Sequence, residues 1–83
     1  MPANSTYVYI LVSEHSETRH YVGCTSDLQD RLKKHNEGGC PHTAKYKPWR
    51  IETAVAFTDK QKAIAFEAYL KSGSGREFAR RHL

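Results

Sequence analysis

The chain has 83 residues, enough for one hydrophobic core and too few for a second domain. Lys and Arg outnumber Asp and Glu by 13 to 9, and the net charge of +4 is consistent with a polyanionic partner. No segment is apolar enough to span a membrane, the N-terminus lacks the pattern of a signal peptide, and two cysteines are too few for a disulfide framework. The composition therefore excludes membrane-spanning and disulfide-rich secreted classes and predicts a cytoplasmic protein.

The first predicted elements form a hairpin. Residues 7–12 are aromatic, β-branched or aliphatic without a break, which predicts a strand that is buried on both faces and central in its sheet. Residues 14–18 are polar and suit the connection to a returning strand over residues 19–22. We expect Gly23 to end this second strand.

A helix is predicted over residues 28–36, because Ser26 or Asp27 can cap its first turn. The two glycines that follow can supply the left-handed turn with which many helices end. Residues 38–49 then form a loop of about a dozen residues, a length at which functional loops become common.

The second half of the chain adds a strand and two helices. Apolar side chains recur at every second position over residues 51–57, which predicts a strand with one face on the core. Thr58 or Asp59 can cap the next helix, which runs to about Lys71. A break rich in Ser and Gly separates it from a short terminal helix over residues 76–83.

This order of elements, β-β-α-β-α-α, predicts an α+β fold. We expect one domain over residues 1–83, with its core at about 7–71. Its centre would be a three-stranded, mainly antiparallel sheet flanked by helices.

Glu67 occupies an unusual position on the predicted helix over residues 60–71. At about 100° per residue, Ala63, Phe66 and Leu70 share one face, and Glu67 lies on or at the edge of it. A buried carboxylate without a partner is costly, so its presence there needs a reason. It is either a boundary residue that reaches solvent or an Arg, or a metal ligand at a cleft.

Arg31 and His35 border the apolar stripe of the predicted helix over residues 28–36. They are four residues apart and therefore neighbours on the helix surface. Either the stem of Arg31 covers apolar surface while its head reaches water, or its guanidinium is aimed at a phosphate. The strand tyrosines Tyr9 and Tyr21 are equally open, because aromatic residues in strands usually pack in the core.

These residues together form a pattern that resembles the motif of a known family. The motif is carried by Val8-Tyr9-Ile10, Tyr21-Val22-Gly23, Arg31 eight residues after the glycine, His35 one turn later, and Glu67 in a later helix. This pattern resembles the GIY-YIG nuclease superfamily over about residues 7–71. The segment over residues 69–76 is similar to the ending of small standalone bacterial members, which resemble the nuclease domain of the excision-repair incision subunit. Val8 replaces the first glycine of the motif, and the asparagine that many members carry after the glutamate has no clear counterpart.

The resemblance implies a metal-dependent endonuclease that hydrolyses phosphodiester bonds in DNA, with a role in DNA repair. Glu67 would hold Mg²⁺, for which Mn²⁺ can substitute, and Arg31 would stabilise the charge of the transition state. Tyr9 would activate or merely orient the attacking water, which Tyr21 would position, and His35 would serve as a second base or a phosphate ligand. A phenolate at Tyr9 would need cationic neighbours to lower its pKa, and Arg31, His35 and Lys45 could provide them.

The expected partner is a nucleic acid, most simply single-stranded DNA. The predicted loop interleaves basic residues with an aromatic ring, a mixture that suits contacts to the backbone and stacking on unpaired bases. Trp49 follows this loop and belongs either to the core or to the stacking surface. The proposed binding residues are Lys34, Lys45, Tyr46, Lys47 and Arg76. Nothing implies a protein partner, and we expect a monomer or a weak homodimer.

Two alternatives remain at this stage. The chain could be a module that binds nucleic acid on the same fold without cutting it, in which case it would not need all of the residues assigned to catalysis. It could instead hold a structural zinc ion with Cys24, His35, Cys40 and His42. Those residue types are suitable ligands, but the sequence lacks the closely spaced cysteine pair typical of such sites.

Overall fold

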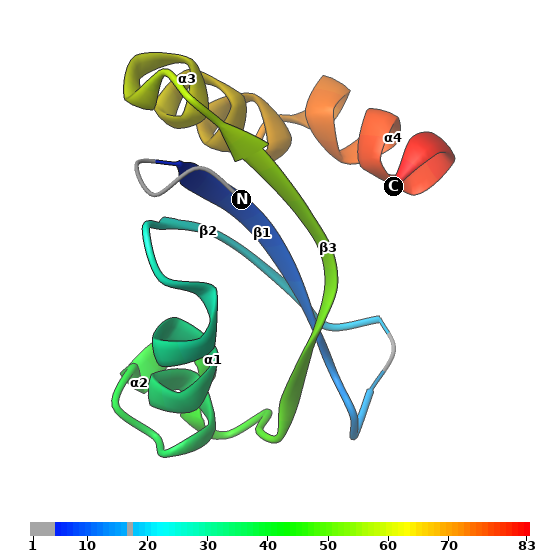
Figure 1. Ribbon diagram of the computed structural model, residues 1–83. Coiled ribbons are helices and arrows are strands. Elements are labelled where there is room, and N and C mark those ends of the chain that lie inside the picture. Colours follow the sequence, from blue (N-terminus) through cyan, green and yellow to red (C-terminus); the bar gives the residue numbers. More distant parts are fainter. Residues whose placement is uncertain (1–4, 17) are drawn as a thin grey trace.

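The computed structural model describes residues 5–16 and 18–83, so Glu17 in the predicted hairpin connection and residues 1–4 lie outside the described part. Its sheet has three strands in the order β2-β1-β3, and β1 pairs antiparallel with both neighbours. The elements, shown in Figure 1, are β1 (Thr6–Ser13), β2 (His20–Thr25), α1 (Leu28–Asn36), α2 (Pro41–Ala44), β3 (Trp49–Phe57), α3 (Lys60–Leu70) and α4 (Gly73–His82). The predicted α+β fold is confirmed. No helix in the described part is both long and apolar enough to cross a membrane.

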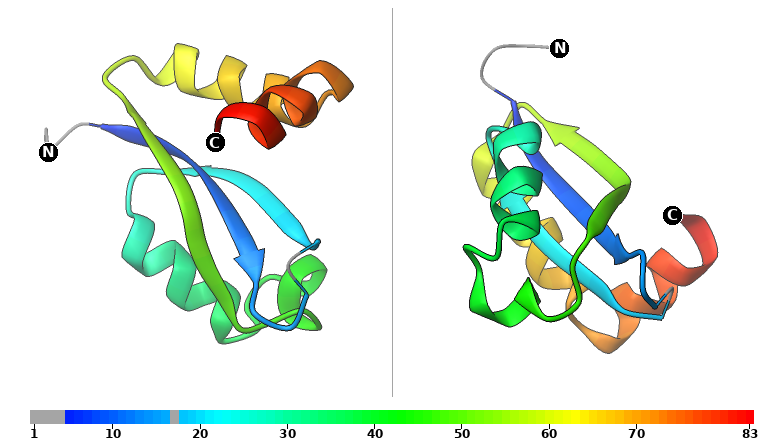
Figure 2. Two further views of the ribbon diagram at one scale, coloured as in Figure 1. Left: turned by 90° about the vertical axis from the view of Figure 1, so that its right-hand side faces the viewer. Right: turned by 90° about the horizontal axis from the view of Figure 1, so that it is seen from below.

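β1 is the central strand of the sheet, and both of its faces are covered. On one face, Val8 and Ile10 pack against Ala63 and Leu70 of α3. On the other face, Tyr9 and Leu11 pack with Trp49 and with half-buried residues of α1. The helices therefore lie on two sides of the sheet, α1 and α2 on one (the α1 side) and α3 and α4 on the other (the α3 side), as Figure 2 shows.

β3 serves both sides of the sheet, although the sequence predicts a strand with one inward face. Ile51 pairs with Leu11 and packs on the α1 side, whereas Phe57 packs on the α3 side. The register shifts between Ile10 and Leu11, so one extra residue of β3 stands between Ile51 and Thr53. An extra residue exchanges the two faces of a strand, because side chains alternate from one residue to the next. The apolar residues that alternate along β3 therefore pack partly on the α1 side of the sheet and partly on the α3 side.

Helix ends follow the predicted capping signals. Asp27 accepts a hydrogen bond from the backbone N–H of Asp30 at the start of α1, and Asp59 caps α3 in the same way. After α1 the chain turns through Gly38, whose φ of 79° lies in the left-handed region that favours glycine.

Three boundaries differ from the prediction. β2 does not end at Gly23 but continues to Thr25. The loop expected over residues 38–49 contains the short helix α2. α4 begins at Gly73 instead of residue 76, because the hydroxyl of Ser72 caps it by accepting from the backbone N–H of Gly75 at 3.1 Å. In β2 strand pairing, and in α4 a capping hydrogen bond, overrides the local tendency of Gly and Ser to interrupt an element.

Candidate active site

Tyr9, Tyr21 and His35 form an aromatic cluster on the α1 side of the sheet. Tyr9 comes from β1, Tyr21 from β2 and His35 from α1. The ring centroids of Tyr21 and His35 are 4.8 Å apart, and those of Tyr9 and His35 are 6.1 Å apart. The structure therefore brings together three residues that the sequence analysis assigned to catalysis from separate elements.

Gly23 lies beneath this cluster and has a structural role that the sequence analysis missed. It pairs with Tyr9 across the two strands. A Cβ atom at Gly23 would collide with the ring and the hydroxyl group of Tyr9. The glycine thus lets the Tyr9 side chain lie directly over the β2 backbone, which fixes the direction in which its hydroxyl points. The pairing of Tyr9 with Gly23, once the hairpin register is known, is the signal that could have revealed this.

A chain of hydrogen bonds runs from Tyr9 into the α2 helix. The Tyr9 hydroxyl lies 3.2 Å from Nε2 of His35, and Nδ1 of His35 lies 2.8 Å from the hydroxyl of Thr43. The Thr43 hydroxyl in turn donates to the backbone carbonyl of Cys40 at 3.2 Å. His35 and Thr43 are 1% and 2% exposed. Both ring nitrogens of His35 thus face neighbouring hydroxyl groups inside the protein.

The surroundings of Tyr9 raise its pKa above the usual value, so the protein groups around it favour the neutral phenol. Burial is the main cause, and the charges of Tyr21 and Glu67 add to it, while Arg31 acts in the opposite direction. Burial, followed by the charge of Arg31, lowers the pKa of His35. Tyr9 is thus a neutral phenol that faces a neutral imidazole.

Lys45 does not join this group. Its ammonium lies 5.3 Å from the centre of the Tyr46 ring and is exposed. Lys45, the loop cation expected to lower the pKa of Tyr9, lies instead over the ring of Tyr46.

Arg31 and Glu67 lie on helices on opposite sides of the sheet, and the charge of each acts on Tyr9. Arg31 is exposed on α1, and its charge acts on both Tyr9 and His35. Glu67 stands on α3, where its side chain is 24% exposed and forms an ion pair of 2.9 Å with Lys71. The charge of Glu67 also raises the pKa of Tyr9 and of Cys24. The boundary position expected for Glu67 is found, with a lysine as its partner instead of an arginine.

The donors near the cluster fit Mg²⁺ better than zinc. Across residues 5–16 and 18–83, no three His, Cys, Asp or Glu side chains are close enough together to hold a metal ion. A structural zinc site at Cys24, His35, Cys40 and His42 therefore lacks its ligand cluster. Mg²⁺ is commonly held by one or two carboxylates together with water and substrate phosphate, and the partly exposed carboxylate of Glu67 suits that arrangement.

The residues proposed to bind nucleic acid do not all lie together. Lys45 and Lys47 are exposed beside α2, and Lys34 on α1 forms an ion pair of 3.2 Å with Asp30. Tyr46 is half-buried, and the guanidinium of Arg19 lies 4.6 Å from its ring centre. The ring is therefore less open to a nucleic-acid base than the sequence suggested.

Trp49 belongs to the core and not to a stacking surface. It is 3% exposed, and its indole N–H donates to the backbone carbonyl of Thr43 at 2.9 Å. Its backbone N–H and carbonyl are both bonded to the amide of Asn36. Trp49 thus fastens the loop after α1 to the start of β3.

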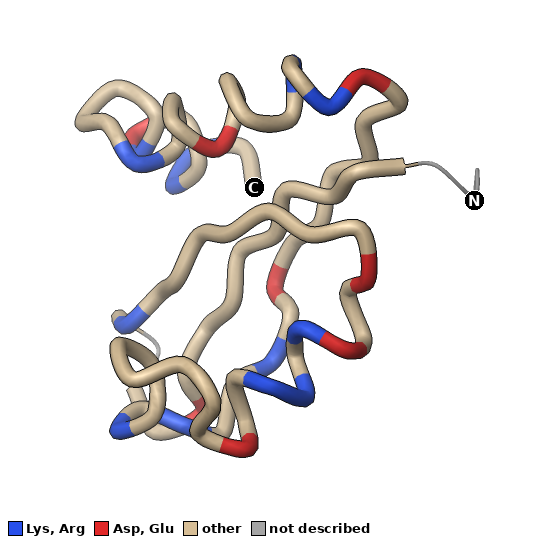
Figure 3. Tube along the Cα trace, turned by 90° about the vertical axis from the view of Figure 1, so that its left-hand side faces the viewer, with Lys and Arg blue, Asp and Glu red and all other residues tan. Residues whose placement is uncertain are grey.

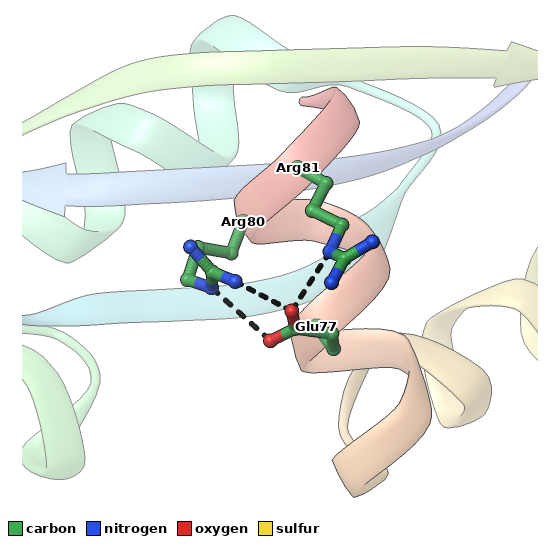
Figure 4. Close-up of polar contacts among 3 residues, drawn as sticks. All are labelled: Glu77, Arg80 and Arg81. Atoms are coloured by element: carbon green, nitrogen blue, oxygen red, sulfur yellow. Dashed lines mark hydrogen bonds and ion pairs between the residues drawn. The ribbon is translucent and has the colours of Figure 1, made fainter.

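Arg76 lies on α4, across the sheet from Lys45 and Lys47. Basic residues occur on both sides of the sheet, along α1 and along α3 and α4 (Figure 3). Arg80 and Arg81 on α4 both pair with Glu77, as Figure 4 shows. Within the described part of the chain, no ion pair involves Arg76.

The comparisons with known proteins agree with this architecture. The model of the GIY-YIG catalytic domain matches residues 5–80. The chain is 38% identical over 72 residues to a UPF0213 protein of Bacillus velezensis, which covers 86% of this chain and 71% of the relative. The solution NMR structure of a UPF0213 protein from Bacillus halodurans superimposes with a TM-score of 0.55 at 34% identity, covering 92% of this chain and 80% of that one. The chain therefore belongs to the GIY-YIG family.

A further relative has a more specific name. The chain is 40% identical over 65 residues to a structure-specific endonuclease subunit SLX1 homologue of Giardia intestinalis. The match covers 71% of this chain but only 18% of that much longer protein. Family membership and this similarity support a nuclease.

Proposed function

We propose that this protein is a metal-dependent endonuclease that hydrolyses phosphodiester bonds in DNA. The observation that carries the proposal is the placement of the Tyr9 hydroxyl, which is held against Nε2 of His35 while the charges of Arg31 and Glu67 both act on it. The hydroxyl thus has a proton acceptor beside it and two opposite charges that act on it, which suits a group that takes part in proton transfer.

Tyr9 and His35 would act together as the base. A water molecule beside Tyr9 would pass a proton to the phenol oxygen as Tyr9 passes its own proton to Nε2 of His35. The water oxygen would form its bond to phosphorus, and the bond to the departing oxygen would break. This relay uses a neutral phenol and a neutral imidazole, which are the forms favoured by the raised pKa of Tyr9 and the lowered pKa of His35. Tyr21, packed against His35, would keep both partners in place and position the water.

Arg31 and Glu67 would handle the charge on the phosphate. The exposed guanidinium of Arg31 can donate two parallel hydrogen bonds to phosphate oxygens as negative charge builds on them. Glu67 would hold the metal ion, Mg²⁺ or Mn²⁺, which when bound would stabilise charge on the phosphate and on the departing oxygen. Lys71 pairs with Oε2 of this carboxylate, so it would compete with the ion for that oxygen.

The experiment is a cleavage assay with purified protein. Labelled oligonucleotides are incubated with Mg²⁺, Mn²⁺ or EDTA, and cleavage is expected only with a divalent ion. Glu67→Ala should abolish cleavage, whereas Lys71→Ala, which removes the other partner of the same ion pair, should not. Retention of more than about a tenth of the rate in Glu67→Ala, a barrier change under about 1.4 kcal/mol, would exclude Glu67 as the sole protein ligand.

The same assay separates the enzyme from a module that only binds nucleic acid. The binding module predicts affinity for the oligonucleotides with no cleavage under any metal condition. It also predicts that Tyr9→Phe and Glu67→Ala behave like the wild-type protein. Cleavage that depends on both residues would reject it.

A further inference from the structure

We propose that Thr43 is a positioning residue that fixes the tautomer of His35. In this arrangement the proton of the imidazole is held on Nδ1, and Nε2 is left free to accept from Tyr9. The catalytic consequence rests on the proposed function, while the tautomer itself can be measured without any cleavage. Thr43 lies in the α2 segment, which the sequence predicted as part of a loop, and the sequence assigned no role to Thr43 itself.

The hydrogen bonds around Thr43 give the direction of donation. A backbone carbonyl can only accept, so the single hydroxyl proton of Thr43 is engaged when it donates to Cys40. The Thr43 oxygen can then only accept from Nδ1 of His35, 2.8 Å away. A neutral imidazole that donates from Nδ1 presents an unprotonated Nε2, and the Tyr9 hydroxyl lies 3.2 Å from that atom. Each donor in this series of hydrogen bonds, from Tyr9 through His35 and Thr43 to Cys40, therefore meets an acceptor.

Burial makes this arrangement decisive. His35 and Thr43 are almost completely enclosed, so water has little access to the imidazole nitrogens and the hydroxyl. The opposite tautomer would turn the Thr43 hydroxyl toward Nδ1 and point an N–H at the Tyr9 oxygen. In that state His35 could not take the proton of Tyr9, and the relay would be blocked.

The surrounding fold holds Thr43 at this point from several directions. The backbone carbonyl of Thr43 accepts from the Trp49 indole, and its backbone N–H donates to Cys40 at 3.1 Å. Trp49 is in turn tied to the end of α1 through Asn36. The helix that carries His35 and the turn that carries Thr43 are therefore fastened together, and the imidazole sits between them. This accounts for the ordered helix α2 inside a segment rich in polar residues.

The test reads the tautomer directly by NMR. In ¹⁵N-labelled protein at about pH 7.5, long-range ¹H–¹⁵N correlations show which ring nitrogen of a histidine carries the proton. The protein has five histidines, so the His35 signals are assigned as those lost in His35→Gln. We expect the wild-type pattern of a protonated Nδ1. In Thr43→Val, which keeps the shape but lacks the hydroxyl, the pattern of a protonated Nε2 should gain population, and Thr43→Ser should restore the wild-type pattern.

A matched variant controls for lost stability. Ser13 is buried on the same side of the sheet, donates to the carbonyl of Tyr46 at 2.6 Å and accepts from the N–H of His15, yet it touches neither Tyr9 nor His35. Ser13→Ala should therefore lower thermal stability without changing the His35 pattern. A wild-type His35 protonated on Nε2, or an unchanged pattern in Thr43→Val, would overturn the proposal.

Single-turnover cleavage tests the consequence. Thr43→Val should lower the rate at least about tenfold, with little change in DNA affinity, and Thr43→Ser should stay near the wild-type rate. A tautomer change in Thr43→Val without a loss of rate would overturn the positioning role. If the wild-type protein cuts no DNA with any metal, the proposed function fails, and the NMR result still decides the tautomer.

Discussion

At Gly23 the backbone of β2 passes beneath the Tyr9 side chain with no room for a methyl group. The glycine therefore sets where the Tyr9 hydroxyl lies relative to His35. A larger residue would force the phenol to move, since the β2 backbone is held in place by its pairing with β1.

We predict that Gly23→Ala lowers both the cleavage rate and the stability. The displaced Tyr9 hydroxyl would no longer reach Nε2 of His35, so cleavage should fall at least about tenfold. The free energy of unfolding should fall by about 1–3 kcal/mol, as is usual for overpacking. The measurements are single-turnover rates and urea denaturation. In a Tyr9→Phe background the same substitution should cost little further rate, and additive losses would contradict the mechanism.

The lowered pKa of His35 predicts a loss of stability in mild acid. Burial and Arg31 disfavour the imidazolium in the native state, whereas an unfolded His titrates near 6.5. Below pH 6.5 the unfolded chain takes up a proton that the native protein does not, so the free energy of unfolding falls as the pH falls. The contribution is fully present above pH 6.5, and its slope is at most about 1.4 kcal/mol per pH unit.

Denaturation curves between about pH 7.5 and pH 5 test this prediction. His35→Gln should be less stable overall but should show a shallower dependence on pH than the wild-type protein. His42→Gln removes an exposed histidine near α2 and should keep the wild-type slope. Equal slopes in the wild-type protein and His35→Gln would show that the native imidazole titrates normally.

The positions of some candidate site residues could be predicted from the sequence, whereas the contacts of others could not, for a physical reason. Helix periodicity is local, so it placed Glu67 and Arg31 at the edges of apolar faces, where the structure has them. The roles of Gly23 and Thr43 depend on contacts with residues far along the chain. No local pattern distinguishes a glycine under a tyrosine from one that ends a strand, or a threonine bonded to a histidine from one in solvent.

At the scale of elements, periodicity and capping predicted which segments are strands and helices, but not how these elements pack against one another. The apolar alternation of β3 is the same with or without the extra residue near Ile51, so the exchange of faces is invisible in the sequence. The same holds for the junction of α3 and α4. A Cβ atom at Gly75 would collide with the backbone of Tyr69 and Leu70, so the two helices meet at a distance that only glycine allows.

We predict that Gly75→Ala destabilises the protein by pushing α4 away from the end of α3. Leu70 is a core residue, so the loss should be at least about 1 kcal/mol. Gly73→Ala is the matched control, because a Cβ atom there meets nothing within 4 Å and alanine favours the helix. Thermal denaturation of the two variants should show opposite or clearly unequal shifts. A Gly75→Ala protein as stable as Gly73→Ala would mean that the helices separate without cost.

At the scale of the molecule, the described residues extend over 32 × 29 × 19 Å. One turn of duplex DNA is about 34 Å long, so a single copy can contact roughly one turn and cannot encircle it. Affinity must then come from a few cations near the site. Lys45 and Lys47 are exposed on the α1 side, whereas Arg80 and Arg81 share one carboxylate on the α3 side.

We predict that the two pairs of cations contribute unequally to DNA binding. Lys45→Gln/Lys47→Gln and Arg80→Gln/Arg81→Gln each lower the net charge of +4 by the same amount. For single strands, each phosphate contact contributes about 0.7 to the slope of log K against log salt. The magnitude of that slope should therefore be smaller by about 1.4 in the lysine variant and nearly unchanged in the arginine variant. Titrations at several salt concentrations measure both. Equal losses would place the DNA on the α3 side as well, where Arg76 lies.

The last prediction concerns the form of the substrate: single-stranded DNA should be cut at least as well as duplex DNA. Trp49 is buried and Tyr46 lies beneath Arg19, so neither ring is freely open for stacking on an unpaired base. The size of the molecule favours single strands, because a protein that spans about one turn of duplex has little surface with which to bend or open it. An unpaired strand can bring its backbone to Arg31 and Tyr9 without that cost. The measurement compares one labelled strand, alone and annealed to its complement, at fixed ionic strength and metal concentration. Faster cleavage of the annealed form, with a rate that rises as the square of protein concentration, would show instead that two copies act together on duplex DNA.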